Sequence, residues 1–294
     1  MYCLLRGLRG LVLSLVPYFA AGSFGSFAQS IDQELALRRE DALRQRVKES
    51  EAIDIFRNLI TREGKGGAIK VRREVRGDER LLKSLSESER DVFNRIVSLH
   101  FEHYLIDDDG VSRLAEMTSL DDLSLVGNFT DKGVTFLQAM QSLKSLALRS
   151  GFVTDASCQT LQHLPALREL DIRYTSITGA GVSSLRKLSN LRKLTLPNNS
   201  EISDADMVQL RHLNLLTSLF VDGTLLTDGG FEHLSKLKNL EWISLAGTRI
   251  TSKSLIYLES MPNLKVVNLD GIPLPARDVS RLREIRPELT IIGQ

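Results

Sequence analysis

The segment "SLFVDGTLLTDGGFEHLSKLKNL", from Ser218 to Leu240, is nearly repeated by the segments before and after it. The upstream copy reads "ELDIRYTSITGAGVSSLRKLSNL" (Glu169 to Leu191), and the downstream copy reads "WISLAGTRITSKSLIYLESMPNL" (Trp242 to Leu264). Self-similarity at a fixed period of roughly 20 to 50 residues is typical of proteins built from stacked supersecondary units. We therefore expect stacked units here rather than a single closed core.

The repeat continues well beyond these three segments, with successive units beginning 23 to 25 residues apart. The unit starts are apolar and fall at Ile96, Leu120, Leu143, Leu167, Leu191, Leu216, Leu240 and Leu264, with Leu289 opening a fragment. The last unit carries "DGIPLPARD" in place of the usual threonine turn, and its prolines cannot donate to a strand ladder. Residues 96–294 are therefore predicted to hold eight units that end in a C-terminal cap.

Each unit has a strand half and a helix half. Apolar residues alternate in the first half, as at Leu170 and Ile172, which predicts a strand. In the second half they are spaced by three, as at Leu185 and Leu188, which predicts one face of a short helix. One such unit cannot bury its apolar face alone, so stability is expected to come from neighbouring units.

Two polar positions recur between the halves. Threonines at 175, 224 and 248 follow the strands, where a hydroxyl can satisfy backbone groups left free by the bend. Aspartates follow a second threonine or serine slightly later, and we expect them to cap the starts of the helices. These aspartates are Asp131, Asp155, Asp204 and Asp228.

The motif "T-x-I-T-D-x-G", repeated over Ile96 to about Ile292, resembles the leucine-rich repeat family in its short strand–helix form of about 24 residues, as in exported bacterial leucine-rich repeat proteins. The resemblance implies an α/β fold: a right-handed solenoid with a parallel sheet on its concave face and helices on its convex face. One departure is an extra residue around "PNNSEIS" (Pro197 to Ser203).

The first 28 residues differ from the rest of the chain. "MYCLLRGLRG" carries two arginines and no acid, an uncharged stretch follows, and Ser26-Phe27-Ala28 supplies small residues before a cleavage point. This three-part pattern predicts a signal peptide at residues 1–28 and export to a periplasmic or extracellular compartment. The alternative is a membrane anchor formed by uncleaved residues 8–28. After cleavage we expect no membrane span, and only Cys158 would remain, so no internal disulfide would form.

Two further segments precede the repeats. Residues 29–64 are charge-rich with an imperfect apolar stripe, which predicts a helical segment without a clean coiled-coil heptad. Residues 65–95 are predicted to form an N-terminal cap over the first strand, with a strand at Ala68 to Val75 and a helix beginning at Ser86 or Ser88. A cap would protect the open sheet edge from aggregation.

Several activity classes find no support in the sequence. Lys and Arg number 38 against 37 Asp and Glu, so the basic excess typical of nucleic-acid binding is absent. Cys158 falls in the register of Val182 and Phe231 and is expected to be a buried apolar residue. His100, Glu102 and His103 supply too few ligands on one face for a metal site. His163, His212 and His233 are expected on solvated helix surfaces. We expect no enzyme activity and no cofactor.

The predicted concave face offers a candidate binding surface instead. In each strand, alternate side chains point away from the core, and eight strands about 4.8 Å apart present a broad face. Such a face suits a protein or peptide better than a metabolite, which prefers an enclosed pocket. A mixed-charge patch and an aromatic pair stand out on it, with Tyr174 at the rim. The candidate partner-binding residues are His100, Glu102, Arg149, Glu169, Asp171, Arg173, Phe220, Asp222 and Trp242.

These features predict a non-enzymatic protein-binding module that uses the concave face. Two alternatives stay open from the sequence. One is a substrate adaptor of the ubiquitin-ligase type, or an effector delivered into a host cell, although residues 30–95 look too polar for an F-box. The other is a structural envelope protein that assembles through the helical segment. The sequence does not name the partner or the oligomeric state.

Overall fold

The computed structural model describes residues 36–38, 40–51, 53, 68–75, 94–102, 106–196 and 201–293. The predicted signal peptide, the helix start at Ser86 or Ser88, and residues 197–200 of the insertion lie outside the described residues. The chain divides into two compact units. The first comprises Met1–Leu59 and Val71–Val97, and the second comprises Ile60–Lys70 and Ser98–Gln294.

The first unit contains a helical stretch over residues 40–51. Ala42, Glu49 and Ile53 are buried there, and the Glu49 carboxylate accepts a hydrogen bond from the backbone N–H of Ile96 at 2.9 Å. Burying a carboxylate is costly unless it is hydrogen-bonded, so this contact helps to hold Glu49 in place. Strand β1 spans Ala68–Val75, the stretch in which the sequence predicts a strand.

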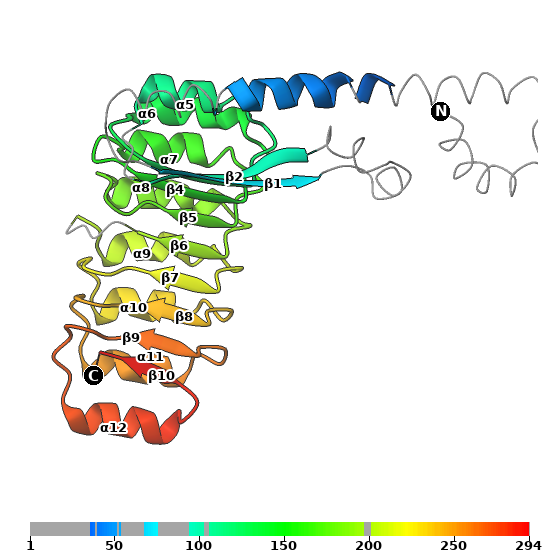
Figure 1. Ribbon diagram of the computed structural model, residues 1–294. Helices are drawn as coiled ribbons and strands as arrows, with labels where there is room; N and C mark the ends of the chain where they lie inside the picture. The colour runs from blue at the N-terminus through cyan, green and yellow to red at the C-terminus, as the bar shows by residue number, and fades with distance from the viewer. Residues whose placement is uncertain are drawn as a thin grey trace, which may run out of the picture. The chain divides into compact units, whose positions relative to one another are not determined.

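The second unit alternates strands with short helices, as the repeat predicts. Its strands follow one another in chain order from β2 to β10, and each consecutive pair is parallel. Helices α6 to α11 line the same side of the stacked strands (Figure 1). The strands after β1 are β2 (Asn94–Glu102), β3 (Asp122–Val126), β4 (Ser145–Arg149), β5 (Glu169–Asp171), β6 (Lys193–Thr195), β7 (Ser218–Phe220), β8 (Trp242–Ser244), β9 (Val266–Asn268) and β10 (Thr290–Ile292).

The helices are one to three turns long. The α-helices are α5 (Asp108–Leu114), α6 (Asp131–Phe136), α7 (Asp155–Leu161), α8 (Gly179–Ser184), α9 (Asp204–Leu210), α10 (Asp228–Leu234), α11 (Leu255–Glu259) and α12 (Ala276–Ile285). In the part of the chain that the structure describes, three 3₁₀ turns accompany them: η3 (Leu137–Ala139), η4 (Leu185–Lys187) and η5 (Ser252–Ser254). Among the described residues, no helix is long and apolar enough to cross a membrane.

The apolar ladder confirms the register read from the sequence. Leu146, Leu170 and Leu194 are paired partners across β4, β5 and β6, and all three are buried. The helix-half leucines, such as Leu161 and Leu185, are also fully buried. Each unit therefore buries its core against the next unit. These contacts between units stabilise the fold, since the described residues form no disulfide.

The turn threonines behave as expected. The hydroxyls of Thr175, Thr224 and Thr248 each donate to a backbone carbonyl three residues earlier, at 2.7, 2.8 and 2.6 Å. Thr224 and Thr248 are buried, so these bonds satisfy hydroxyls that water does not reach.

The prediction that the aspartates cap their own helices is wrong, because they bind the cap residues of the following unit. Asp131, Asp155, Asp204 and Asp228 are the first residues of their helices, and the threonine or serine before each aspartate is the N-cap residue. Each aspartate instead binds the cap of the following unit. Asp155, for example, accepts from the backbone N–H and the hydroxyl of Thr178, both at 2.7 Å. We call these acids and caps together the capping row.

The capping row also contains Asp108, which binds Thr130 in the same manner. Between Asp108 and Asp228 it has one interruption, because Gly179 stands where the other units of that stretch have an acid. There the next unit supplies its own carboxylate: Asp206 accepts from the N–H and hydroxyl of Ser203 at 2.8 and 2.9 Å. A Cβ on Gly179 would lie only 2.1 Å from the Asp206 carboxyl carbon. Glycine at 179 therefore makes room for the replacement acid.

The C-terminal end uses a different device. The guanidinium of Arg286, directly after α12, donates to the carbonyl oxygens of Leu258, Met261 and Leu264 at 2.9 to 3.0 Å. Leu258 lies in α11, and Met261 and Leu264 follow it, so Arg286 adds donors at the C-terminal end of the helix, where carbonyls lack partners within the helix. Leu289 is buried and leads into β10, so the fragment at the end of the repeats contributes a strand.

Candidate functional site

The outward-pointing side chains of the strands form the candidate site, which we call the open face. Successive residues of a strand point to opposite sides of a sheet, so the neighbours of buried leucines lie on this face. The register brings Ala147, Asp171, Thr195 and Phe220 into one transverse row across four strands. The sequence prediction that these strands share one face is therefore confirmed by their pairing.

A groove of about 290 Å³ lies on the open face. Its lining runs from His100 and Asp122 to Lys193 and Thr195, with Arg149, Glu169, Asp171 and Arg173 between them. Most of these side chains are polar or charged, whereas pockets for small metabolites are enclosed and mostly apolar.

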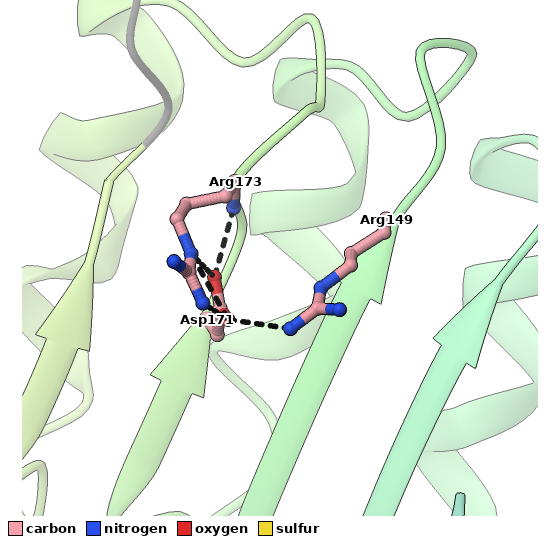
Figure 2. A network of polar contacts seen from close by, with 3 residues as sticks. All are labelled: Arg149, Asp171 and Arg173. Carbon is pink, nitrogen blue, oxygen red and sulfur yellow. Dashed lines mark hydrogen bonds and ion pairs between the residues drawn. The ribbon is translucent and has the colours of Figure 1, made fainter. Parts of the chain in front are cut away.

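Arg149, Asp171 and Arg173 form the central contact of the groove. Arg173 lies just beyond β5, and its Nε and Nη2 atoms donate to the Asp171 carboxylate at 3.0 and 2.7 Å. The backbone N–H of Arg173 adds a bond of 3.1 Å. Arg149 approaches the same carboxylate from β4, with its Nη2 atom 3.6 Å from Asp171 Oδ2 (Figure 2). Asp171 is thus tightly bound by one arginine and loosely by the other.

The pKa values of this group follow from the contacts. Burial opposes ionisation of Asp171, but the hydrogen bonds and positive charge of Arg173, helped by Arg149, hold the pKa of the carboxyl below its ordinary value. The hydrogen bond to Asp171 raises the pKa of Arg173 further. The group therefore carries two positive charges and one negative charge at neutral pH.

His100 and Asp122 lie at the other end of the groove. The Nε2 atom of His100 is 2.7 Å from Oδ2 of Asp122, and the hydroxyl of Ser98 donates to the same oxygen at 2.9 Å. A nucleophile–base relay needs the histidine between the hydroxyl and the carboxylate, using both ring nitrogens. Here Ser98 and His100 converge on one carboxylate oxygen, so the three residues form a polar cluster without that relay geometry.

The predicted aromatic pair does form. Phe220 and Trp242 lie on adjacent strands with ring centroids 5.7 Å apart and a tilt of 52°. Trp242 is 42% exposed. The Lys193 ammonium lies 6.0 Å from the Phe220 ring centroid, at the outer limit of a cation–π contact. Lys193 lines the groove, and Phe220 and Trp242 lie on the next two strands of the open face, toward the C-terminal units.

The other predicted site residues differ in their surroundings. Oδ1 of Asp222 is bound by the Ser244 hydroxyl and by the Ala246 backbone N–H, which fixes this carboxylate within the face. Glu169 is exposed beside Asp171. Glu102 ends β2, but its side chain lies outside the described residues.

Asp122 and Lys193 also line the groove, although they are not among the candidate residues chosen from the sequence. Asp122 is paired with Ser98 in the strand register, and Lys193 is paired with Glu169. Pairing with the chosen residue Glu169 was the available signal for Lys193, because directly opposed side chains interact.

Cys158 is fully buried, as predicted. Burial and the negative charges of Asp155 and Asp131 raise the pKa of its thiol to about 12. Since the thiolate is the nucleophilic form, this cysteine is unreactive at neutral pH.

The remaining histidines depart partly from expectation. His163 and His212 are exposed, but they lie in turns after their helices rather than within them. His233 lies in α10, is half-buried, and its Nδ1 atom has no hydrogen-bond partner among the described residues. Within the described part of the chain, no three His, Cys, Asp or Glu side chains gather to hold a metal ion.

Comparison with known families agrees with the repeat pattern. Residues 141–200 and 167–226 match the family model described as leucine rich repeat. The chain carries a leucine-rich repeat domain. The matched stretch runs from the turn before β4 to the loop after β7 and contains Arg149, Asp171 and Arg173 of the open face. No curated protein sequence matches the chain.

Solved structures similar to the chain include two internalins from Listeria monocytogenes strain 4b F2365. One is 25% identical over 62% of this chain and 50% of its own length, with a TM-score of 0.49. The other, internalin C2, is 25% identical over 63% of this chain and 84% of its own length, also with a TM-score of 0.49. This chain therefore matches about half the length of the first internalin.

Proposed function

We propose that the chain is a non-enzymatic recognition protein that binds a protein or peptide on the open face of its leucine-rich repeat sheet. The single observation that carries the proposal is the groove across five strands, whose charged side chains share one surface with an exposed tryptophan. Aromatic residues and arginine are enriched among the residues that dominate protein interfaces. A leucine-rich repeat domain supports a role in protein interaction.

The dimensions of the site favour a macromolecular partner. The groove, of about 290 Å³, lies at the lower end of the range of about 300–1,000 Å³ usual for metabolite pockets, and its lining is mostly polar where theirs is mostly apolar. An extended segment can instead contact several neighbouring strands at once, because strands repeat about every 4.8 Å. The proposed contact residues are His100, Glu102, Arg149, Glu169, Asp171, Arg173, Phe220, Asp222 and Trp242.

The proposal includes export, based on the signal-like pattern of residues 1–28. The partner would then be a protein met outside the cytoplasm. Residues 29–64 and 65–95 would precede the binding domain as a helical segment and a cap.

A display selection on the full chain tests the proposed function. Peptides enriched on the wild-type protein would be measured against an Arg173→Glu/Trp242→Ala variant and a matched control, Lys187→Glu/Ile256→Ala. Lys187 and Ile256 are exposed residues of η4 and α11, on the helix side. We expect the first variant to bind at least about tenfold more weakly and the control to bind like the wild type. Equal binding by all three folded proteins would refute the open-face assignment.

A further inference from the structure

The chemistry of the partner can be inferred from an imbalance at the centre of the groove. Arg149 and Arg173 share one carboxylate, and Arg173 occupies both of its oxygens. Arg149 is left with a single contact at 3.6 Å, beyond ordinary hydrogen-bond distance. Figure 2 shows the two guanidinium groups on either side of Asp171. The group therefore has one more cation than it has anions.

The imbalance is also visible in unmet hydrogen bonding. The Nε–H of Arg149 is buried and has no acceptor among the described residues. A buried donor without an acceptor costs about 1–3 kcal/mol. Glu169, the nearest acid on the same strand as Asp171, forms no ion pair within the described part of the chain. The missing acceptor is therefore not supplied by this chain's neighbouring carboxylate.

We propose that Arg149 binds a carboxylate of the partner, from an acidic side chain laid in the groove. This inference rests on the proposed function and names the chemistry that the open face recognises. A carboxylate beside Arg149 would neutralise the second guanidinium and offer two acceptor oxygens. Arginine is well suited to this contact, because its planar donors match carboxylate geometry.

Tyr174, the residue after the groove-lining Arg173, supplies an independent observation. It is 73% exposed, and its backbone has φ of 59°. The corresponding positions of later units are Gly223, Gly247 and Gly271, all with positive φ. A bulky residue in this conformation is strained by about 1–3 kcal/mol, and such strain is concentrated at binding sites.

The placement of Tyr174 gives the acidic segment a second contact. Glycine would meet the needs of the backbone at this position, as it does in the later units. The exposed ring therefore has no evident role in the turn itself. It lies next in sequence to the arginine that flanks Asp171, where it can cover the apolar part of a bound side chain.

The test uses peptides recovered by the display selection and remade with blocked termini. Each would be prepared with glutamate and with glutamine at its acidic position, and dissociation constants would be measured for wild type, Arg149→Met and Asp171→Asn. Lys187→Met serves as the matched control outside the groove. Amidated ends separate recognition of a side chain from recognition of a terminal carboxylate.

We expect the glutamate-to-glutamine change to weaken wild-type binding roughly 10- to 100-fold, as for a charge-assisted contact. The same change should have little effect on Arg149→Met. Asp171→Asn should bind the glutamate peptide more tightly than wild type, because Arg173 is released; a purely structural role for Asp171 would weaken binding instead.

The outcomes distinguish failure of this inference from failure of the proposed function on which it rests. Peptides that require the open face but tolerate glutamine overturn the carboxylate assignment and leave the proposed function standing. The carboxylate assignment to Arg149 is also overturned, and the proposed function still stands, if the glutamine change weakens binding equally in wild type and in Arg149→Met. Binding that needs a free peptide terminus also overturns the side-chain assignment. If no selected peptide depends on the open face, both proposals fail.

Discussion

The capping row and the open face use the same residue types in opposite ways. In the capping row, each carboxylate is filled by donors from the next unit: Asp131 accepts from the N–H and hydroxyl of Thr154 and from the hydroxyl of Ser157. On the open face, Asp171 is shared by two arginines, Arg149 has an unmet donor, and Trp242 is exposed. The carboxylates of the capping row thus have their hydrogen-bond donors within the chain, whereas on the open face the Nε–H of Arg149 lacks an acceptor among the described residues.

This difference separates stability from recognition. A solenoid is held together by contacts between neighbouring units, so polar bonds that link one unit to the next should contribute most per residue. Groups left incompletely paired contribute little to folding and are available to a partner. Substitutions in the two regions should therefore have different consequences.

The largest effect on stability is expected from removing a link of the capping row. Asp131→Ala leaves the N–H of Thr154 and the buried Ser157 hydroxyl without their acceptor, so we expect a loss of about 3 kcal/mol in the free energy of unfolding. Urea denaturation measures it. Asp109→Ala is the control, since Asp109 is an exposed acid in the first turn of α5. Equal losses for both variants would show that the inter-unit bonds contribute nothing special.

The interruption at Gly179 sharpens the same idea. Gly179→Ala places a methyl group against Asp206 and should cost about 1–3 kcal/mol. The exchange Gly179→Asp/Asp206→Gly rebuilds the arrangement of the other units and should recover most of this loss. Thermal unfolding of the three proteins checks the coupling. A double variant less stable than Gly179→Ala would mean that the two positions do not substitute for one another.

Acid should weaken the capping row. Burial opposes ionisation of Asp131 and Asp228, but hydrogen bonds from serine and threonine prevail and lower the pKa of both carboxyls. A lowered folded-state pKa gives stability that is complete above the unfolded value of about 3.9 and is lost as pH falls through the folded value. The free energy of unfolding should therefore fall below about pH 4. Urea titrations at several pH values should show a smaller fall for Asp131→Asn than for wild type.

The smallest effect is expected at Tyr174. Tyr174→Gly relieves the left-handed backbone but makes the unfolded chain more flexible, so stability should rise by no more than about 1 kcal/mol. Binding of selected peptides should weaken, because the ring is lost. Calorimetry and peptide titration on one preparation measure both. A variant that is clearly less stable would show that the tyrosine supports the turn.

The fold was predictable because its signal is repeated in every unit. The alternation around Leu170 and the spacing of Leu185 and Leu188 gave strand, helix and register together. The role of the aspartates was not predictable in the same way. Thr154 and Asp155 are adjacent in the sequence, and the period is the same whether Asp155 binds its own unit or the next one. Only the stacking distance in space decides between them.

The site was predictable as a surface but not as a set of contacts. Strand register placed Arg149, Asp171 and Arg173 together, yet both arginines are equally plausible partners for the acid by position. Side-chain geometry makes Arg173 the tight partner. The backbone of Tyr174 had a usable signal, because Gly223 and Gly247 occupy its place in later units.

The most direct test of the division between the two regions is peptide affinity, measured at a temperature where all proteins are folded. The variants are Arg149→Met/Trp242→Ala on the open face and Asp131→Ala in the capping row. The account predicts that the open-face variant loses binding of the selected peptides by at least about tenfold, while Asp131→Ala binds like wild type despite its lower stability. Wild-type affinity in the open-face variant, or lost affinity in folded Asp131→Ala, would contradict it.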